Sequence, residues 1–75
     1  MKLADFLKEF QDLLQRDDPI DPEAALEDLE EWDSLAIMAC IAYFDKKFGL
    51  KTTYRTFRDS HRVSDIVALT KGAVA

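Results

Sequence analysis

The sequence predicts an all-α fold, a four-helix bundle with three longer helices, one short third helix and a long loop between the first two helices. Apolar residues recur at intervals of three and four along most of the chain, which is the spacing of amphipathic helices. No stretch shows the strict alternation of a strand. With 75 residues, the chain is expected to form a single domain, residues 1–75, with few positions free for an enzyme pocket.

The first helix is expected within Lys2–Arg16, because its apolar residues fall on one face. These are Leu3, Phe6, Leu7, Phe10, Leu13 and Leu14. Pro19 and Pro22 stop the helix, since proline has no amide proton and disfavours helix in the residue before it. The connection that follows reaches Asp33, and we expect it to be anchored to the core by Ile20, Leu26 and Leu29.

The second helix is expected to begin after Asp33, a favourable N-cap, and to end at Phe48, before Gly49. It carries two apolar stripes. The first, a core stripe, contains Ile37, Cys40, Ile41, Phe44 and Phe48. The second contains Leu35, Met38, Ala39 and Ala42. A helix that is apolar on two sides is either enclosed in the core or shows one side to a partner.

Two further helices are expected in the last third of the chain. Thr53 is a possible N-cap for a short helix with Tyr54 and Phe57 one turn apart. The last helix is predicted from the helical spacing of four residues that end in a fraying terminus. These residues are Val63, Ile66, Val67 and Thr70.

The net charge of −5 is unevenly distributed along the chain. Met1 to Ser34 holds three basic and twelve acidic residues, whereas Leu35 to Ala75 holds seven basic and three acidic ones. An acidic half repels phosphates, so no nucleic-acid partner is expected, although Arg55, Arg58 and Arg62 keep a small helical nucleic-acid binder as an alternative. The acidic half favours protein partners that present lysine and arginine.

Catalytic and metal chemistry have little support in the sequence. Cys40 and the single histidine, His61, form no pair at ligand spacing, so no metal site is expected. Ser34 has no base close in sequence and no glycine-flanked turn, so no enzyme activity is expected. Gly49 and Gly72 are the only glycines, which excludes a phosphate-binding glycine loop.

The setting expected for the chain is the cytoplasm, as a monomer. A single cysteine makes no internal disulfide, and no basic-then-apolar leader opens the sequence. The longest uncharged run, Leu35 to Phe44, is half the roughly 20 residues that a bilayer requires, so no membrane insertion is expected.

Ser34 occupies a position with its own physical chemistry. As the first residue of a helix it lies where free amides and the helix dipole favour a negative group, so a phosphate ester on its hydroxyl would be stabilised. The stretch "WDSL" at this helix start, followed by "FGL" and "VSDIVAL" at their observed separations, resembles the acyl carrier proteins. The likeness covers almost the entire chain.

The resemblance implies a four-helix bundle whose Ser34 carries 4'-phosphopantetheine, transferred from coenzyme A by a magnesium-dependent phosphopantetheinyl transferase. The arm's thiol would hold acyl groups as thioesters. Asp33 and Leu35 would flank the attachment site in the motif that the transferase reads, and the helix beginning at Ser34 would be the recognition surface. The partner-binding residues implied are Met38, Ala39, Ala42, Asp45, Lys46, Arg55 and Arg58. Further expected partners are an acyl-loading ligase or transferase and a downstream synthase.

The sequence departs from the family in its charges. Many members carry acids along the recognition helix, whereas Asp45 is the only acid here between Leu35 and Phe48, and Lys46 and Lys47 follow it. We therefore expect a specialised carrier with its own partners, outside general fatty acid synthesis. The alternatives are a stand-alone aminoacyl or peptidyl carrier, and an unmodified carrier-like module that serves only for interaction.

Overall fold

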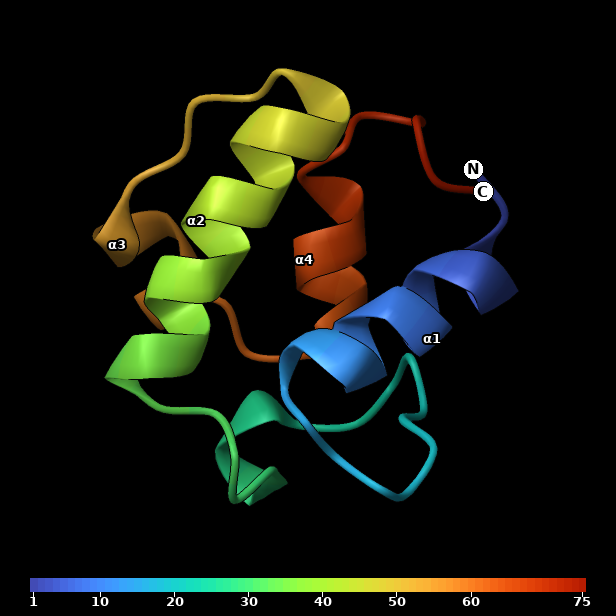
Figure 1. Cartoon of the computed structure of the whole chain (residues 1–75), viewed down its shortest axis with the longest axis vertical. Helices are drawn as coiled ribbons and strands as arrows, with labels where there is room; N and C mark the ends of the chain where they lie inside the picture. The colour runs from blue at the N-terminus through green and yellow to red at the C-terminus, as the bar shows by residue number, and fades with distance from the viewer.

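Four helices and one 3-10 turn make up the regular structure of the chain. The computed structural model describes residues 1–75. The elements are α1 (Leu3–Leu13), η1 (Leu26–Asp28), α2 (Ser34–Phe48), α3 (Tyr54–Arg58) and α4 (Val63–Ala68) (Figure 1). There is no strand, only an isolated bridge between Ala25 and Arg62. The prediction of an all-α chain with four helices is confirmed.

The prediction of three longer helices is wrong, because α4 has 6 residues and is nearly as short as α3, which has 5. Beyond Ala68 the backbone tightens: Thr70 N–H donates to the carbonyl of Val67, three residues back, and so does the Thr70 hydroxyl. Lys71 and Gly72 then take positive φ angles of 53° and 93°, which end the helical path. The bundle therefore has two long and two short helices.

The loop after α1 is held by its own hydrogen bonds and by buried side chains. Gln15, directly beyond the helix, has a φ of 55°, so α1 ends before Pro19 is reached. The side-chain amide of Gln11 donates to the carbonyls of Arg16 and Asp17. The three expected anchors of this connection are all buried, namely Ile20, Leu26 and Leu29.

The ends of α2 lie where the sequence predicts them. The carboxylate of Asp33 accepts a hydrogen bond from the Ala36 amide at 2.9 Å, which makes Asp33 the N-cap. At the other end Gly49 adopts a left-handed φ of 67°, and its amide donates to the carbonyl of Asp45. Both boundaries are set by local chemistry, so Ser34 begins the helix.

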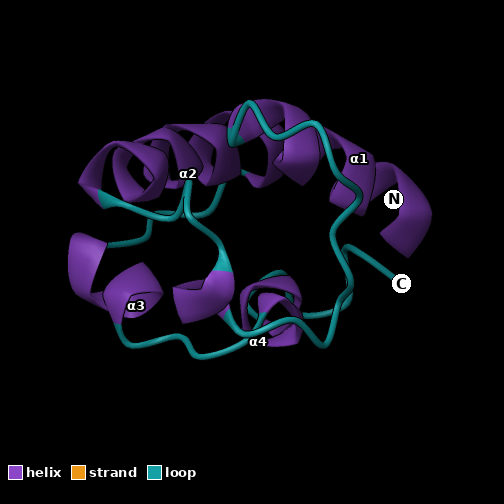
Figure 2. Cartoon of the chain, turned by 90° about the horizontal axis from the view of Figure 1, so that it is seen from below, coloured by secondary structure: helices purple, strands orange, loops and turns teal.

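The core is aromatic and lies between two layers. In Figure 2, α1 and α2 lie on one side and α3 and α4 on the other. Phe44 of α2 connects the layers: its ring centroid is 6.3 Å from that of Phe6 in α1 and 5.1 Å from that of Phe57 in α3. All three rings are fully buried. The contacts with Phe57 hold α3 against α2.

The two ends of the chain lie side by side (Figure 1). The N-terminal ammonium donates to the carbonyl of Ala73 at 2.8 Å, and the Leu3 amide donates to the carbonyl of Ala75 at 2.7 Å. These bonds close the bundle away from the start of α2, which Figure 1 shows at its opposite side. None of the helices combines the length and the apolar character needed to cross a bilayer.

Candidate functional site

The hydroxyl of Ser34 is at the molecular surface. Ser34 is the first residue of α2 and its side chain is exposed. Its Oγ shares a hydrogen bond of 2.9 Å with the hydroxyl oxygen of Tyr54, the first residue of α3. The starts of two helices therefore meet at the predicted attachment residue, at an exposed part of the surface.

The backbone around Ser34 has spare donors. Of the first amides of α2, that of Ala36 donates to the Asp33 carboxylate and that of Ile37 to the Asp33 carbonyl. The amides of Ser34 and Leu35 donate to no group of the chain. Free amides and the positive end of the helix dipole favour a negative group at this end of α2, so the residues present suit a phosphate ester on Oγ.

The second apolar stripe of α2 faces solvent. We call this surface, made by Leu35, Met38, Ala39 and Ala42, the apolar stripe. Leu35 is 79% exposed and Met38 is 59% exposed, while Ala39 is half-buried. Large apolar side chains that remain this exposed next to one another are typical of an interaction surface. Packing of Leu35 and Met38 in the core, the other interpretation of the sequence, is excluded.

The charged residues predicted to bind partners differ in how far the chain neutralises them. Asp45 accepts from the Lys51 ammonium at 2.8 Å, and Arg58 lies 3.2 Å from the carboxylate of its neighbour Asp59. Lys46 and Arg55 are exposed and take part in no ion pair. Lys46 and Arg55 are therefore the predicted partner-binding charges that the chain leaves unpaired, and both are positive.

A shallow hollow of about 390 Å³ lies beside Ser34, where the end of α1 meets the start of α2. Leu13, the last residue of α1, and Leu14 after it line the hollow together with Leu35 and Ala39 of the apolar stripe. The carboxylates of Glu31 and Asp33 contribute its polar lining. This hollow extends the apolar stripe toward α1 and gives it an acidic border at the serine.

The acidic border is held in place by an ion pair. The Arg16 guanidinium donates to Glu31 at 2.8 Å, which ties the loop before α2 to the end of α1. A hydrogen bond from its own backbone amide and the bond from Arg16 hold the pKa of Glu31 below its usual range. Glu31 therefore stays ionised near Ser34 at neutral pH.

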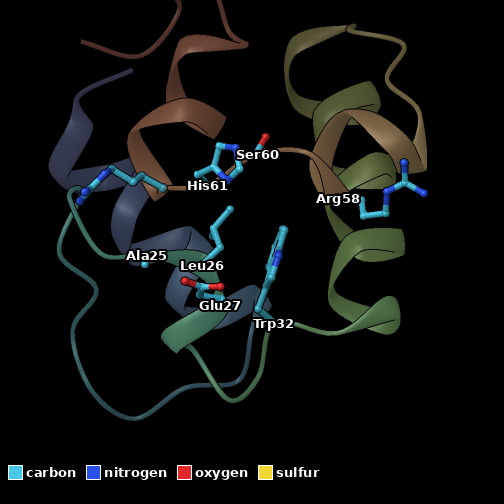
Figure 3. A pocket seen from close by; sticks show the side chains of 8 residues that line it. Ala25, Leu26, Glu27, Trp32, Arg58, Ser60 and His61 are labelled. Atoms are coloured by element: carbon cyan, nitrogen blue, oxygen red, sulfur yellow. The ribbon is translucent and has the colours of Figure 1, made fainter.

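A second hollow, of about 320 Å³, lies below the turn between α3 and α4 (Figure 3). Trp32 forms one wall, with its ring centroid 6.0 Å from that of Phe10, and Leu26 and His61 form others. Arg58 points away from the other labelled side chains in Figure 3, and the Arg62 guanidinium donates to the carbonyl of Glu23. The Arg62 guanidinium is thus bonded to the backbone, and Arg58 lies beside the Asp59 carboxylate.

Cys40 and His61 differ in their exposure to solvent. Cys40 is fully buried, and burial raises the pKa of its thiol to about 12. His61 is exposed on the turn before α4. No three metal-ligating side chains of the chain converge. Ser34 is thus the exposed hydroxyl that the sequence argument singles out, and Cys40 offers no accessible thiol.

Asp33, Ser34 and Leu35 lie together at one helix start, as the sequence predicts, whereas the contact of Tyr54 with Ser34 has no signal in the sequence. The two hydroxyl residues are 20 positions apart, and no local pattern reports a contact over that separation. Of the two aromatic residues that predicted α3, Phe57 is buried, whereas Tyr54 is 38% exposed. Comparisons of the chain with protein-family models, with curated proteins and with solved structures found no match.

Proposed function

We propose that the chain is a carrier protein that holds acyl groups as thioesters on a 4'-phosphopantetheine arm attached to Ser34. The observation that carries the proposal is the exposed Ser34 hydroxyl at the first position of α2, next to the exposed side chains of Leu35 and Met38. An attachment residue and a docking surface are thereby adjacent. The four-helix arrangement of the acyl carrier proteins, to which the sequence is similar, is part of this proposal.

The residues around Ser34 suit attachment of the arm. Oγ is exposed, and the free amides of Ser34 and Leu35 favour the negative charge that a phosphodiester brings. Asp33 caps the helix, which keeps the serine at a defined position. Asp33 and Leu35 would be read by a phosphopantetheinyl transferase as the flanks of its target.

In this proposal the chain itself catalyses no reaction. It tethers the acyl group through the arm and presents it to partner enzymes. When bound, the arm supplies a terminal thiol that forms the thioester with the acyl group. The rigid start of α2 fixes the root of the tether, so cargo is kept at high effective concentration near a docked enzyme. Cys40 takes no part, because its thiol is buried and stays protonated at neutral pH.

Partners would dock on the apolar stripe and on the charged residues around it. Besides the transferase, these are a loading ligase or transferase and a downstream synthase. Arg55 on α3 and Lys46 on α2, which form no ion pair, would repel an enzyme with a basic docking patch, which supports a specialised partner set. A cytoplasmic location is part of the proposal. The exposed apolar stripe also supports the second candidate, an unmodified interaction module, since the stripe exists without the arm.

The test is enzymatic attachment of the arm. We expect incubation of the chain with coenzyme A, Mg²⁺ and a broad-specificity phosphopantetheinyl transferase to raise its intact mass by one 4'-phosphopantetheine group. Ser34→Ala should show no increase. Ser64→Ala is the matched control, because Ser64 lies in α4 and its hydroxyl makes no hydrogen bond, and it should be modified like the wild type.

Two results would contradict the proposal. One is a wild-type chain whose mass does not change, which would favour the unmodified interaction module. The other is a mass increase that persists in Ser34→Ala, which would move the attachment to another residue.

A further inference from the structure

We infer that Tyr54 is a positioning residue for Ser34: its hydroxyl holds the serine oxygen in place for attachment of the arm. The inference rests on the proposed function and adds a residue of α3 to the attachment site. Its basis is the hydrogen bond of 2.9 Å between Ser34 Oγ and the Tyr54 hydroxyl. This is the bond that the serine side chain makes within the chain.

Tyr54 is held opposite Ser34 by the packing of α3. Phe57, one turn further along, is fully buried, with its ring centroid 5.1 Å from that of Phe44 in α2. The Thr53 side chain accepts from the Thr56 amide and caps the start of α3, and the Ser60 hydroxyl donates to the Thr56 carbonyl at its end. The five residues of α3 are thus capped at both ends and anchored by Phe57. This fixes the backbone position from which the Tyr54 side chain extends.

The chemistry of the two hydroxyls assigns the donor. A phenol is more acidic than an alkyl alcohol, so it is the better hydrogen-bond donor, while the serine oxygen is the better acceptor. With Tyr54 donating, the serine keeps its own proton free for the base of the transferase, and a second lone pair of Oγ stays free for attack. The bond thus orients Oγ without blocking it.

During attachment the Tyr54 hydroxyl also stabilises the negative charge that develops on Ser34 Oγ. Oγ of Ser34 forms a bond to the phosphorus next to pantetheine in coenzyme A, and the bond from that phosphorus to the departing adenosine 3',5'-bisphosphate breaks. The serine proton passes to the base of the transferase, and Tyr54 keeps its proton. As Oγ loses its proton, a donor already aimed at it stabilises the growing negative charge.

The experiment compares steady-state kinetics of arm attachment on the wild-type chain and on Tyr54→Phe, with coenzyme A saturating and the carrier varied. Tyr54→Phe removes only the hydroxyl, and the net value of an exposed hydrogen bond predicts that kcat falls roughly two- to fivefold. KM for the carrier should stay the same, because the apolar stripe that docks the transferase is intact.

Tyr43→Phe is the matched control. The Tyr43 hydroxyl donates to Glu9 of α1 at 3.0 Å, so this variant also loses one side-chain hydrogen bond between two elements, but none at Ser34. It should be modified with wild-type kcat and KM. The urea midpoint of each variant separates a loss of stability from a loss of rate.

The outcomes distinguish the two proposals. A reduced kcat in Tyr54→Phe, absent from Tyr43→Phe, supports the positioning role. If Tyr54→Phe is modified as fast as the wild type, or faster, the positioning role is overturned while the carrier function stands. A wild-type chain that accepts no arm overturns the carrier function and this inference with it.

Discussion

Asp33 combines two contributions that are separable by substitution. Its carboxylate caps α2 by accepting from the Ala36 amide, and it places a negative charge directly before Ser34. The cap stabilises the fold whether or not Ser34 is modified. The charge also interacts with the positive end of the helix dipole, and it meets any enzyme that approaches the serine. Removing the cap and removing only the charge should therefore affect stability and modification to different extents.

We expect Asp33→Ala to lower the free energy of unfolding by about 1 kcal/mol, because the cap is lost. Asp33→Asn should retain most of that stability, since asparagine caps equally well, yet slow arm attachment if the transferase reads the charge. Urea titration and the mass assay measure the two effects. Glu30→Ala, at a nearby exposed acid with no side-chain hydrogen bond, should change neither property. Equal stability of Asp33→Ala and wild type would refute the capping role.

The burial of Cys40 determines how the folded chain reacts with thiol reagents. Because the side chain is fully buried and burial raises the pKa of the thiol to about 12, almost no thiolate exists at neutral pH. The folded chain without an arm should therefore resist iodoacetamide until urea unfolds it, whereas a chain carrying the arm should take up one label. Mass spectrometry counts the labels. Rapid labelling of the folded, unmodified chain would show that Cys40 is accessible.

At the scale of elements, the helices agree with the sequence where local chemistry sets their ends. Asp33 and Gly49 bound α2, and Thr53 caps α3, all as expected from residue types. The predicted length of α4 is wrong because the apolar spacing continues to Thr70, whereas the helix ends at Ala68. The Thr70 hydroxyl donates to the Val67 carbonyl, and the backbone tightens there. Periodicity alone does not distinguish an α-helical turn from a tighter one.

The start of α4 makes the stability of the fold depend on pH through Asp65. The amides of Arg62 and His61 donate to its carboxylate, which holds the pKa of Asp65 below its usual value of 3.8. The folded state therefore binds this proton less tightly than the unfolded state. The resulting stabilisation is present above the usual pKa and is lost as the pH falls through the lowered one.

We expect Asp65→Asn to destabilise the fold at neutral pH and to reduce the loss of stability on acidification. Urea midpoints measured from neutral pH to below 3.8 test this, since only the wild type carries the titrating group. Asp18→Asn, at an exposed acid without a side-chain hydrogen bond, serves as the control and should follow the wild type. Identical pH profiles for Asp65→Asn and wild type would contradict the assignment.

At the scale of the whole molecule, the uneven charge of the sequence becomes an acidic loop before Ser34 and exposed positive residues on α2 and α3. The acidic side is the loop before α2, where Asp33 lies beside the hollow and Glu31 is paired with Arg16. The positive side is Lys46 with Arg55, which no carboxylate of the chain neutralises. A partner that covers the apolar stripe and extends to both charged regions needs complementary charges for each of them. This requirement fixes the orientation of the partner and excludes partners with the wrong charges.

Reversing the charge of the two arginines of α3 should impair association with the natural loading enzyme. We expect Arg55→Glu combined with Arg58→Glu to lower the rate of association by about tenfold at low salt, with a smaller difference at high salt. The matched control is Lys2→Glu with Lys71→Glu, the same change of charge at exposed residues near the chain ends. Stopped-flow kinetics over a range of salt measure both. Loading at the wild-type rate would show that these arginines do not select partners.

The sequence by itself determined the helix order, the ends of α2, the buried anchors of the loop and the candidate serine. Each of these depends on residues within a few positions of one another, through caps, breakers and periodicity. Only the tertiary structure decided that Leu35 and Met38 face solvent and that Tyr54 meets Ser34 across 20 positions. The physical reason is that α1 and α3 pack against other sides of α2 through Phe6, Phe44 and Phe57, and contacts between distant segments leave no local pattern in the chain.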